Sequence, residues 1–175
     1  MKISKQGLDL IKRFEGLELD AYMPTPNDVP TIGYGHTKTA KMGMTITARG
    51  AEVLLKHDLA WVEAGVNKHV KVTLTQPQYD ALCSFVYNLG ATNFRRSTLL
   101  KRLNEGNFAA AANELPRWNK QGKRVLRGLT HRRAAERELF ISEPSVTTLT
   151  GPQGPTGGLL AALIAFLMAL LKNRS

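Results

Sequence analysis

The sequence predicts an α+β fold, with a small β-containing N-terminal lobe followed by a larger all-helical C-terminal lobe. Residues 17–45 are rich in glycine, proline and strand-forming residues, which favour short strands and turns. After Thr47 the apolar residues recur at helical spacing, and a polar capping residue precedes most of the apolar runs. A chain of 175 residues is long enough for one modest domain with an appendage. We therefore expect a two-lobed domain with a cleft between the lobes.

One helix is expected before the β-containing segment. Ser4 is a good N-cap, and the apolar residues that follow it, up to Phe14, recur on one face of a helix. Gly16 favours the end of this helix, because glycine tolerates the left-handed backbone of a C-terminal turn. We therefore expect Glu15 to lie on a rigid helix while facing outward at a chain reversal.

The helical lobe is expected to contain five helices. Thr47 can cap a long first helix, and Thr75, with Pro77 just inside, opens a second helix that closes near Gly90. The three helices that follow are each bounded by a capping residue, a glycine or a proline. They are expected from Ser97 to Gly106, from Asn107 to Pro116 and from about Thr130 to Phe140.

The composition changes abruptly after residue 144. Residues 145–158 are rich in threonine, glycine and proline and have no periodic apolar face, which predicts a linker. Residues 159–171 are uninterruptedly apolar and are followed by a basic end, so residues 159–175 are expected to form a hydrophobic C-terminal helix. The apolar run would be about 20 Å long as a helix, against a membrane core of about 30 Å. Partial insertion into a membrane or perturbation of the outer membrane is the favoured hypothesis, and packing on the enzyme or on a partner is the alternative.

The net charge of +10 implies an anionic partner. Nucleic acid, an anionic glycan and the headgroups of a membrane all satisfy that requirement. The chain has no helix-turn-helix, zinc-finger or RNA-recognition motif, so we expect no nucleic acid.

Cysteine and histidine usage argues against metal and disulfide chemistry. Cys83 is the single cysteine, which excludes an intramolecular disulfide, and its apolar neighbours predict a buried, inert thiol. The four histidines show no metal-ligand spacing with one another or with Cys83, so we predict no metal and no other cofactor.

An ordered set of motifs carries a family resemblance. It begins with Phe14-Glu15-Gly16-Leu17, Ala21-Tyr22 and Thr31-Ile32-Gly33-Tyr34-Gly35-His36-Thr37, and continues through residues 78–85, 88–90 and 97–100 to Trp118 and residues 128–136. Together these motifs resemble the phage-type lysozymes, or endolysins, of the T4/lambdoid muramidase family. The resemblance covers roughly residues 3–140. It implies a lysozyme-like catalytic domain over residues 1–144.

What the resemblance implies about activity is hydrolysis of the β-1,4 bond between N-acetylmuramic acid and N-acetylglucosamine in peptidoglycan. Glu15 would then be the acid that protonates the leaving oxygen. The family usually has an aspartate at the position occupied here by Pro24, and the loop before the family threonine is longer here by one residue. Asp28 is the favoured replacement, Asp20 is a second candidate, and the absence of any carboxylate partner is the third hypothesis.

Thr31 matches the family threonine and would hold the attacking water. A water held on the far side of the sugar implies an inverting single displacement. Tyr34, His36 and Asn88 are the candidate substrate contacts, although His36 could instead organise its loop and Asn88 could end its helix. One of Arg127, Arg132 and Arg133 is expected to reach the acid.

The leading hypothesis is a monomeric endolysin that lyses the bacterial host. The alternatives are a lytic transglycosylase and a non-enzymatic protein that disrupts membranes. Residues 1–7 have no apolar core of signal-peptide length, so we expect synthesis in the host cytoplasm and another route to the periplasmic cell wall. Residues 159–175 could associate with an anionic outer or inner membrane.

Overall fold

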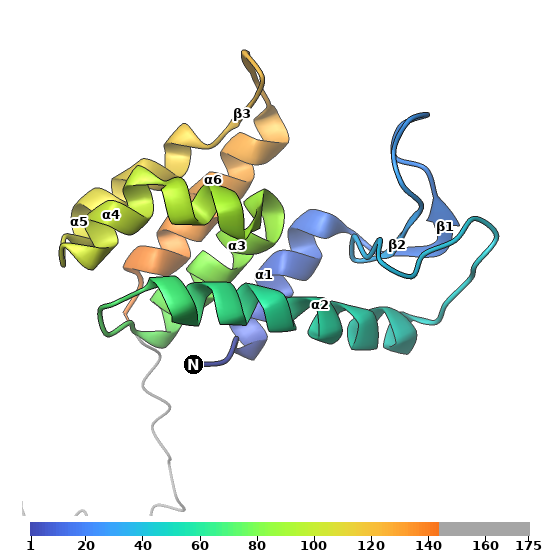
Figure 1. The fold of residues 1–175 in the computed structure, drawn as a ribbon, viewed down its shortest axis with the longest axis horizontal. Coiled ribbons are helices and arrows are strands. Elements are labelled where there is room, and N and C mark those ends of the chain that lie inside the picture. Colours follow the sequence, from blue (N-terminus) through green and yellow to red (C-terminus); the bar gives the residue numbers. More distant parts are fainter. Residues whose placement is uncertain (144–175) are drawn as a thin grey trace, which may run out of the picture. The chain divides into compact units, whose positions relative to one another are not determined.

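Figure 1 shows the computed structural model, which describes residues 1–143 as a small β-containing lobe and a larger helical lobe. The predicted linker and C-terminal helix lie outside the described residues. The helices are α1 (Lys5–Glu15), α2 (Ala48–His69), α3 (Gln76–Arg96), α4 (Thr98–Asn104), α5 (Phe108–Glu114), the 3-10 helix η1 (Leu115–Arg117) and α6 (Arg127–Ile141). The strands are β1 (Glu18–Tyr22), β2 (Thr31–Gly33), β3 (Lys120–Gln121) and β4 (Arg124–Val125). The predicted α+β class is confirmed.

The β lobe is built on a two-stranded antiparallel sheet. β1 pairs with β2 so that Glu18 lies opposite Gly33 and Tyr22 opposite Thr31, with a shift in register between the two pairs. Residues 23–30 form the exposed loop that joins the strands. α2 contacts both β2 and α3, so this helix belongs to both lobes and fixes one against the other.

The predicted start and end of α1 are confirmed. The Ser4 hydroxyl accepts hydrogen bonds from the backbone N–H groups of Gln6 and Gly7. The helix ends at Gly16, whose φ of 75° and ψ of 170° lie in a region that only glycine populates readily. The chain reversal after Glu15 therefore depends on a glycine, but through an extended conformation instead of the expected left-handed helical turn.

The helical lobe follows most of the predicted start and stop signals. Thr47, Thr75, Ser97 and Asn107 each accept a hydrogen bond from the backbone of the helix they precede. Within α3 the backbone is broken at Gly90, with φ 82° and ψ 154°, where the sequence predicted the helix to close.

The expectation of an all-helical C-terminal lobe is wrong in one respect, and α6 begins earlier than predicted. β3 and β4 form a hairpin between η1 and α6, with Gly122 at φ 59° in its turn. Both strands are two residues long and exposed on both faces, so no alternation of apolar and polar residues marks them. α6 starts at Arg127 and not at Thr130. Its N-cap residue is Leu126, whose side chain makes no capping hydrogen bond, so this start has no capping signal in the sequence.

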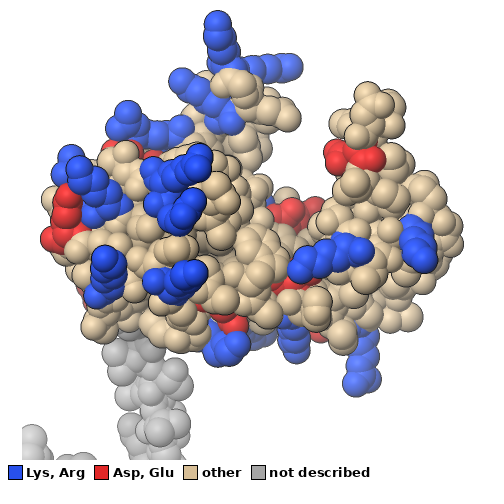
Figure 2. All heavy atoms as spheres, in the orientation of Figure 1, with Lys and Arg blue, Asp and Glu red and all other residues tan. Residues whose placement is uncertain are grey.

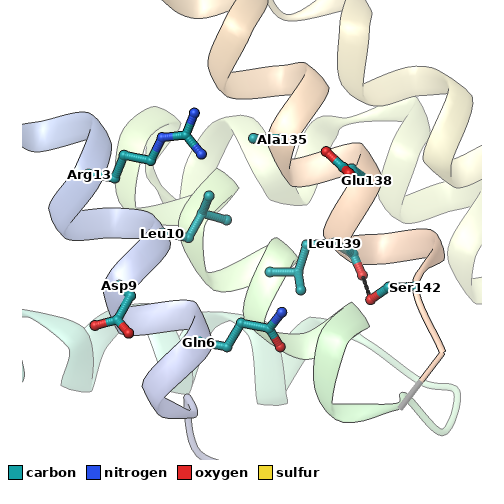
Figure 3. A pocket seen from close by; sticks show the side chains of 8 residues that line it. All are labelled: Gln6, Asp9, Leu10, Arg13, Ala135, Glu138, Leu139 and Ser142. Atoms are coloured by element: carbon teal, nitrogen blue, oxygen red, sulfur yellow. Dashed lines mark hydrogen bonds between the residues drawn. The ribbon is translucent and has the colours of Figure 1, made fainter. Parts of the chain in front are cut away.

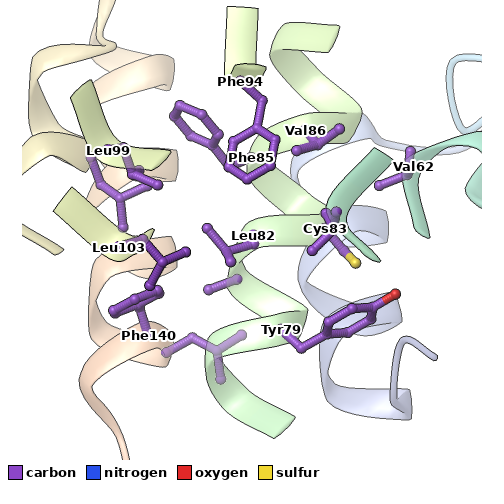
Figure 4. Packing of buried hydrophobic residues seen from close by; sticks show 14 of the residues in the cluster. Val62, Tyr79, Leu82, Cys83, Phe85, Val86, Phe94, Leu99, Leu103 and Phe140 are labelled. Atoms are coloured by element: carbon purple, nitrogen blue, oxygen red, sulfur yellow. The ribbon is translucent and has the colours of Figure 1, made fainter. Parts of the chain in front are cut away.

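The core lies in the helical lobe around α3. Figure 4 shows Leu82, Phe85 and Phe94 packed among side chains of the neighbouring helices, and the rings of Phe85 and Phe94 meet edge to face at 6.4 Å between centroids. Cys83 is fully buried there, as predicted, and burial raises the pKa of its thiol. Among residues 1–143, no helix is long and apolar enough to cross a membrane.

Candidate active site

Glu15 lies at the edge of a cavity of about 330 Å³ between the two lobes. The space-filling view in Figure 2 shows the corresponding hollow, with acidic side chains at its base. Four parts of the fold supply the walls: the end of α1, the loop after β2, α2 and α3. The residues that line the cavity are Glu15, Gly35, Thr37, Lys38, Asp58, Trp61, Tyr87 and Asn88.

The two oxygens of the Glu15 carboxylate have different surroundings. Oε1 accepts a hydrogen bond from Nη1 of Arg132 at 2.6 Å, which confirms that an arginine of the last helix reaches this acid. Oε2 lies on the side of Gly35, where a Cβ atom would come to 3.4 Å from it. The side chain is 20% exposed, so the carboxylate is accessible from the cavity while Arg132 holds its orientation.

Arg132 is itself held by a buried carboxylate. Its Nε lies 3.1 Å from Oε1 of Glu136, and its Nη2 donates to the backbone carbonyl of Ser84 at 3.2 Å. The Ser84 hydroxyl donates to Glu136 as well, at 2.7 Å. Burial raises the pKa of Glu136, and the guanidinium groups of Arg133 and Arg132 oppose that shift.

Arg133 forms the other half of this network. Its Nη2 donates to Oδ1 of Asn88 at 2.8 Å and its Nε lies 3.1 Å from Oε2 of Glu136. The guanidinium also lies over the Phe85 ring, 5.1 Å from the centroid. Burial lowers the pKa of Arg133 to about 10. Through Glu136, the two arginines therefore connect the acid on one wall of the cavity to the amide on another.

His36 is almost completely buried, at 2% exposure, and both ring nitrogens are occupied. Nε2 accepts from the backbone N–H of Thr39 at 3.1 Å, so the proton is on Nδ1, which donates to Oδ2 of Asp58 at 2.7 Å. Asp58 is on α2, and this contact ties the loop after β2 to that helix.

Aromatic residues of α2 and α3 form the wall beside Asn88. Trp61 stacks on Tyr87 with 6.4 Å between centroids and 16° between planes. The Tyr87 hydroxyl donates to the backbone carbonyl of Tyr34 at 2.7 Å, and burial raises its pKa, so the phenol keeps the proton that it donates. The Tyr34 ring does not line the cavity and lies beneath the ammonium of Lys12, 5.6 Å from it.

The two candidate carboxylates and Thr31 do not line the cavity. Asp28 is exposed in the loop between β1 and β2, where its Oδ1 accepts from the N–H of Val29 at 3.0 Å. Asp20 accepts from the Thr45 hydroxyl at 2.6 Å. Thr31 is buried, with 7% of the residue exposed, and its hydroxyl donates to the Val29 carbonyl at 3.1 Å.

A second cavity, of about 390 Å³, lies between α1 and α6 (Figure 3). Leu10 and Leu139 project into it, and Asp9, Arg13 and Glu138 stand at its edges. It contains none of the predicted site residues. No cluster of potential metal ligands occurs within the described part of the chain.

The family model for phage lysozyme matches residues 12–136, and the chain therefore belongs to the phage lysozyme family. The endolysin of Bacillus phage PZA is 51% identical over 144 residues, which cover 81% of this chain and 56% of that protein. The chain thus spans only about half the length of that relative. The endolysin of Salmonella phage P22 is 46% identical over 147 residues, covering 81% of this chain and 99% of the phage protein.

Solved structures agree with the lysozyme-like fold. The muramidase domain of SpmX from Asticaccaulis excentricus has a TM-score of 0.77 and 42% identity, over 81% of this chain and 99% of that one. The endolysin from Escherichia coli O157:H7 phage FAHEc1 has a TM-score of 0.76 and 43% identity, over 81% and 94% of the two chains. The resemblance and the fold predicted from the sequence are confirmed, and the chain is a glycoside hydrolase of the lysozyme class.

The structure predicts that Glu136→Gln strongly destabilises the domain. A neutral amide would leave two buried guanidinium groups without their shared carboxylate, and breaking a buried ion pair costs about 3–5 kcal/mol. Urea denaturation measures the free energy of unfolding. Glu105→Gln is the control, because the Arg102–Glu105 pair is 47% and 43% exposed, and losing such a pair costs under about 1 kcal/mol. Equal, small losses in both variants would contradict the assigned role of Glu136.

Proposed function

We propose that this chain is a peptidoglycan muramidase that cleaves the β-1,4 bond between N-acetylmuramic acid and N-acetylglucosamine during lysis of a bacterial host. The observation that carries this proposal is the placement of Glu15 at the edge of the cavity between the lobes, with one oxygen held by Arg132. Membership of the phage lysozyme family supports it.

The proposed first event is proton transfer from Glu15. Because Oε1 is occupied by Arg132, the proton is delivered from Oε2 to the glycosidic oxygen as the bond from that oxygen to the anomeric carbon breaks. Gly35 has no side chain to cover Oε2, so a sugar can approach this oxygen closely. Water attacks the anomeric carbon from the opposite face as this bond breaks and gives up its proton to a nearby carboxylate or to solvent, which gives inversion.

Thr31 and Asp28 are the proposed groups that position this water. The Thr31 hydroxyl uses its hydrogen on the Val29 carbonyl, so its lone pairs can accept a hydrogen bond from water. Asp28 is preferred over Asp20 because it is exposed in a loop and has one contact within its turn. The carboxylate of Asp20 instead accepts from the Thr45 hydroxyl, and the backbones of these two residues form an antiparallel β-bridge.

Among the three proposed substrate contacts, Asn88 is the one whose side chain lines the cavity. Its Oδ1 is occupied by Arg133, which leaves Nδ2 to donate to an acetamido carbonyl of the glycan. For His36 we propose that it acts through Asp58 by holding the loop, and for Tyr34 that its backbone position, fixed by Tyr87, shapes the site.

A lytic transglycosylase is the second candidate, because neither Asp20 nor Asp28 lines the cavity beside Glu15. Such an enzyme needs one acid and forms a 1,6-anhydro product without water. Mass spectrometry of digested peptidoglycan separates the two reactions, since hydrolysis leaves a free reducing end whose mass is larger by one water.

Residues 159–171 support a second proposal, that the chain associates with an anionic membrane. The domain itself is proposed to act on the wall as a monomer. The run is wholly apolar and basic residues follow it. The domain would reach the periplasm by a route that other proteins provide.

Glu15→Gln should abolish wall hydrolysis while the protein stays folded, because an amide cannot deliver the proton. Loss of a general acid lowers the rate on the order of 10²–10⁴-fold. Turbidity of purified cell walls measures the rate. Glu18→Gln is the matched control on exposed β1 and should keep full activity. Substantial activity of the Glu15 variant would remove that residue from the acid role.

Asp28→Asn should reduce turnover strongly, whereas Asp20→Asn should not. The amide of the first variant still accepts the turn hydrogen bond from Val29, so the loop is kept while the negative charge is lost. The turnover number of each variant on purified walls decides between the candidates. Mild and equal effects would favour water held by Thr31 without a carboxylate.

Deleting residues 145–175 should sharply reduce binding to vesicles of anionic phospholipid and leave hydrolysis of purified walls nearly unchanged. Removing the apolar run takes away the surface that lipid would bury. Vesicle sedimentation and wall turbidity test both halves on the same protein. Reduced wall hydrolysis and melting temperature, with vesicle binding intact, would instead mean that the segment packs on the enzyme.

A further inference from the structure

Residues 120–127 carry four basic side chains on a projecting hairpin. Lys120, Lys123, Arg124 and Arg127 are all exposed, and residues 118–135 include no aspartate or glutamate. β3 and β4 pair so that Lys120 lies opposite Val125 and Gln121 opposite Arg124. The positive charge is therefore presented on a defined structural element.

The base of the hairpin is fixed to the start of α6. The N–H of Leu126 donates to the carbonyl of Asn119 at 2.9 Å, and Nδ2 of Asn119 donates to the Thr130 hydroxyl at 3.3 Å. The Gly122 turn has a positive φ of 59°, which closes the two strands tightly. α6 also carries Arg132, so the hairpin and the arginine that holds the acid belong to one continuous segment.

The part of the chain that the structure describes offers these four charges no acidic partner. Within residues 1–143, no carboxylate oxygen lies within 4.0 Å of any of them, whereas Lys5, Lys12, Arg102 and Arg117 each form an ion pair on the surface. Exposed basic groups that a protein does not neutralise internally attract anionic ligands and raise their local concentration.

Figure 2 shows where the charge lies. The basic projection of the helical lobe rises beside the hollow that contains the catalytic cavity, and the projecting part of the β lobe on the other side carries acidic side chains. An anionic group that projects from a glycan in the hollow toward this side would be attracted to the hairpin.

We propose that the β3–β4 hairpin and Arg127 bind the carboxylates of the peptides attached to the glycan strand, so that the enzyme prefers peptide-bearing over peptide-stripped peptidoglycan. This inference rests on the proposed muramidase function. Each muramic acid carries such an acidic peptide on its lactyl group, beside the bond to be cleaved. Removing the peptide leaves a single carboxylate on the lactyl group and takes away the other carboxylates that the hairpin is proposed to bind.

The test replaces all four basic residues with glutamine (Lys120→Gln, Lys123→Gln, Arg124→Gln and Arg127→Gln). The matched control removes the same charge elsewhere on the surface (Lys56→Gln, Lys68→Gln, Lys71→Gln and Lys101→Gln). The hairpin variant should show an apparent KM raised by about tenfold on peptide-bearing walls at low salt, with kcat unchanged and the difference shrinking as salt increases. On amidase-stripped glycan strands it should match the wild-type protein, and the control should match on both substrates.

Direct binding separates this inference from the proposed function. A soluble acidic stem peptide, titrated against wild-type protein and both variants in an NMR experiment, should shift hairpin amides in the wild-type and control proteins only. If the wild-type protein cleaves neither substrate yet binds the peptide through the hairpin, the muramidase proposal fails and the docking surface stands. Equal losses of the two variants, or equal losses on both substrates, overturn the docking surface. The docking surface is also overturned if the hairpin variant loses binding to anionic vesicles or to DNA but still binds the stem peptide.

Discussion

The carboxylate of Glu136 is the interaction on which the active site depends. It lies fully buried between Arg132 and Arg133, two positive charges that the interior could not hold together without it. Arg132 continues to Glu15 and Arg133 to Asn88, so one buried anion determines the orientation of two polar groups that face the same cavity. Because α6 packs on α3, the side chains that organise the site are held by the packing of the core.

The opposite wall of the cavity depends on a second buried polar contact and on glycines. His36 binds Asp58 of α2, and Gly33 at φ 68° places β2 so close to α2 that a Cβ would come to 3.3 Å from Ala51. Gly35 has no side chain, and the space in front of Glu15 therefore stays open. Each wall is thus fixed by a charged or polar pair that is shielded from water, while the surface between the walls stays accessible.

The sequence predicted elements wherever a local signal exists. Hydroxyl and amide caps set the helix starts, and they are read directly from residues such as Ser4 and Thr75. The β3–β4 hairpin was missed because two exposed residues per strand carry no periodicity, and only Gly122 indicates its turn. α6 was predicted too short because Leu126 gives no capping signal and the helix start is set by its neighbours in the fold.

Residues of the candidate site could be predicted only where the sequence itself carries a signal for them. Glu15 was assigned from the family resemblance and from its position before a glycine, whereas Trp61 and Tyr87 fit the apolar spacing of their helices and give no sign of lining a cavity. The net charge of +10 indicates an anionic partner, but it does not tell which basic residues are structural and which are available to a ligand. The fold makes that separation, since it buries Arg132 and Arg133 against Glu136, whereas the basic side chains of the hairpin have no acidic partner within residues 1–143. Residues 120–133 therefore supply both the arginines that orient Glu15 and Asn88 and the exposed basic residues that are proposed to bind an anionic substrate.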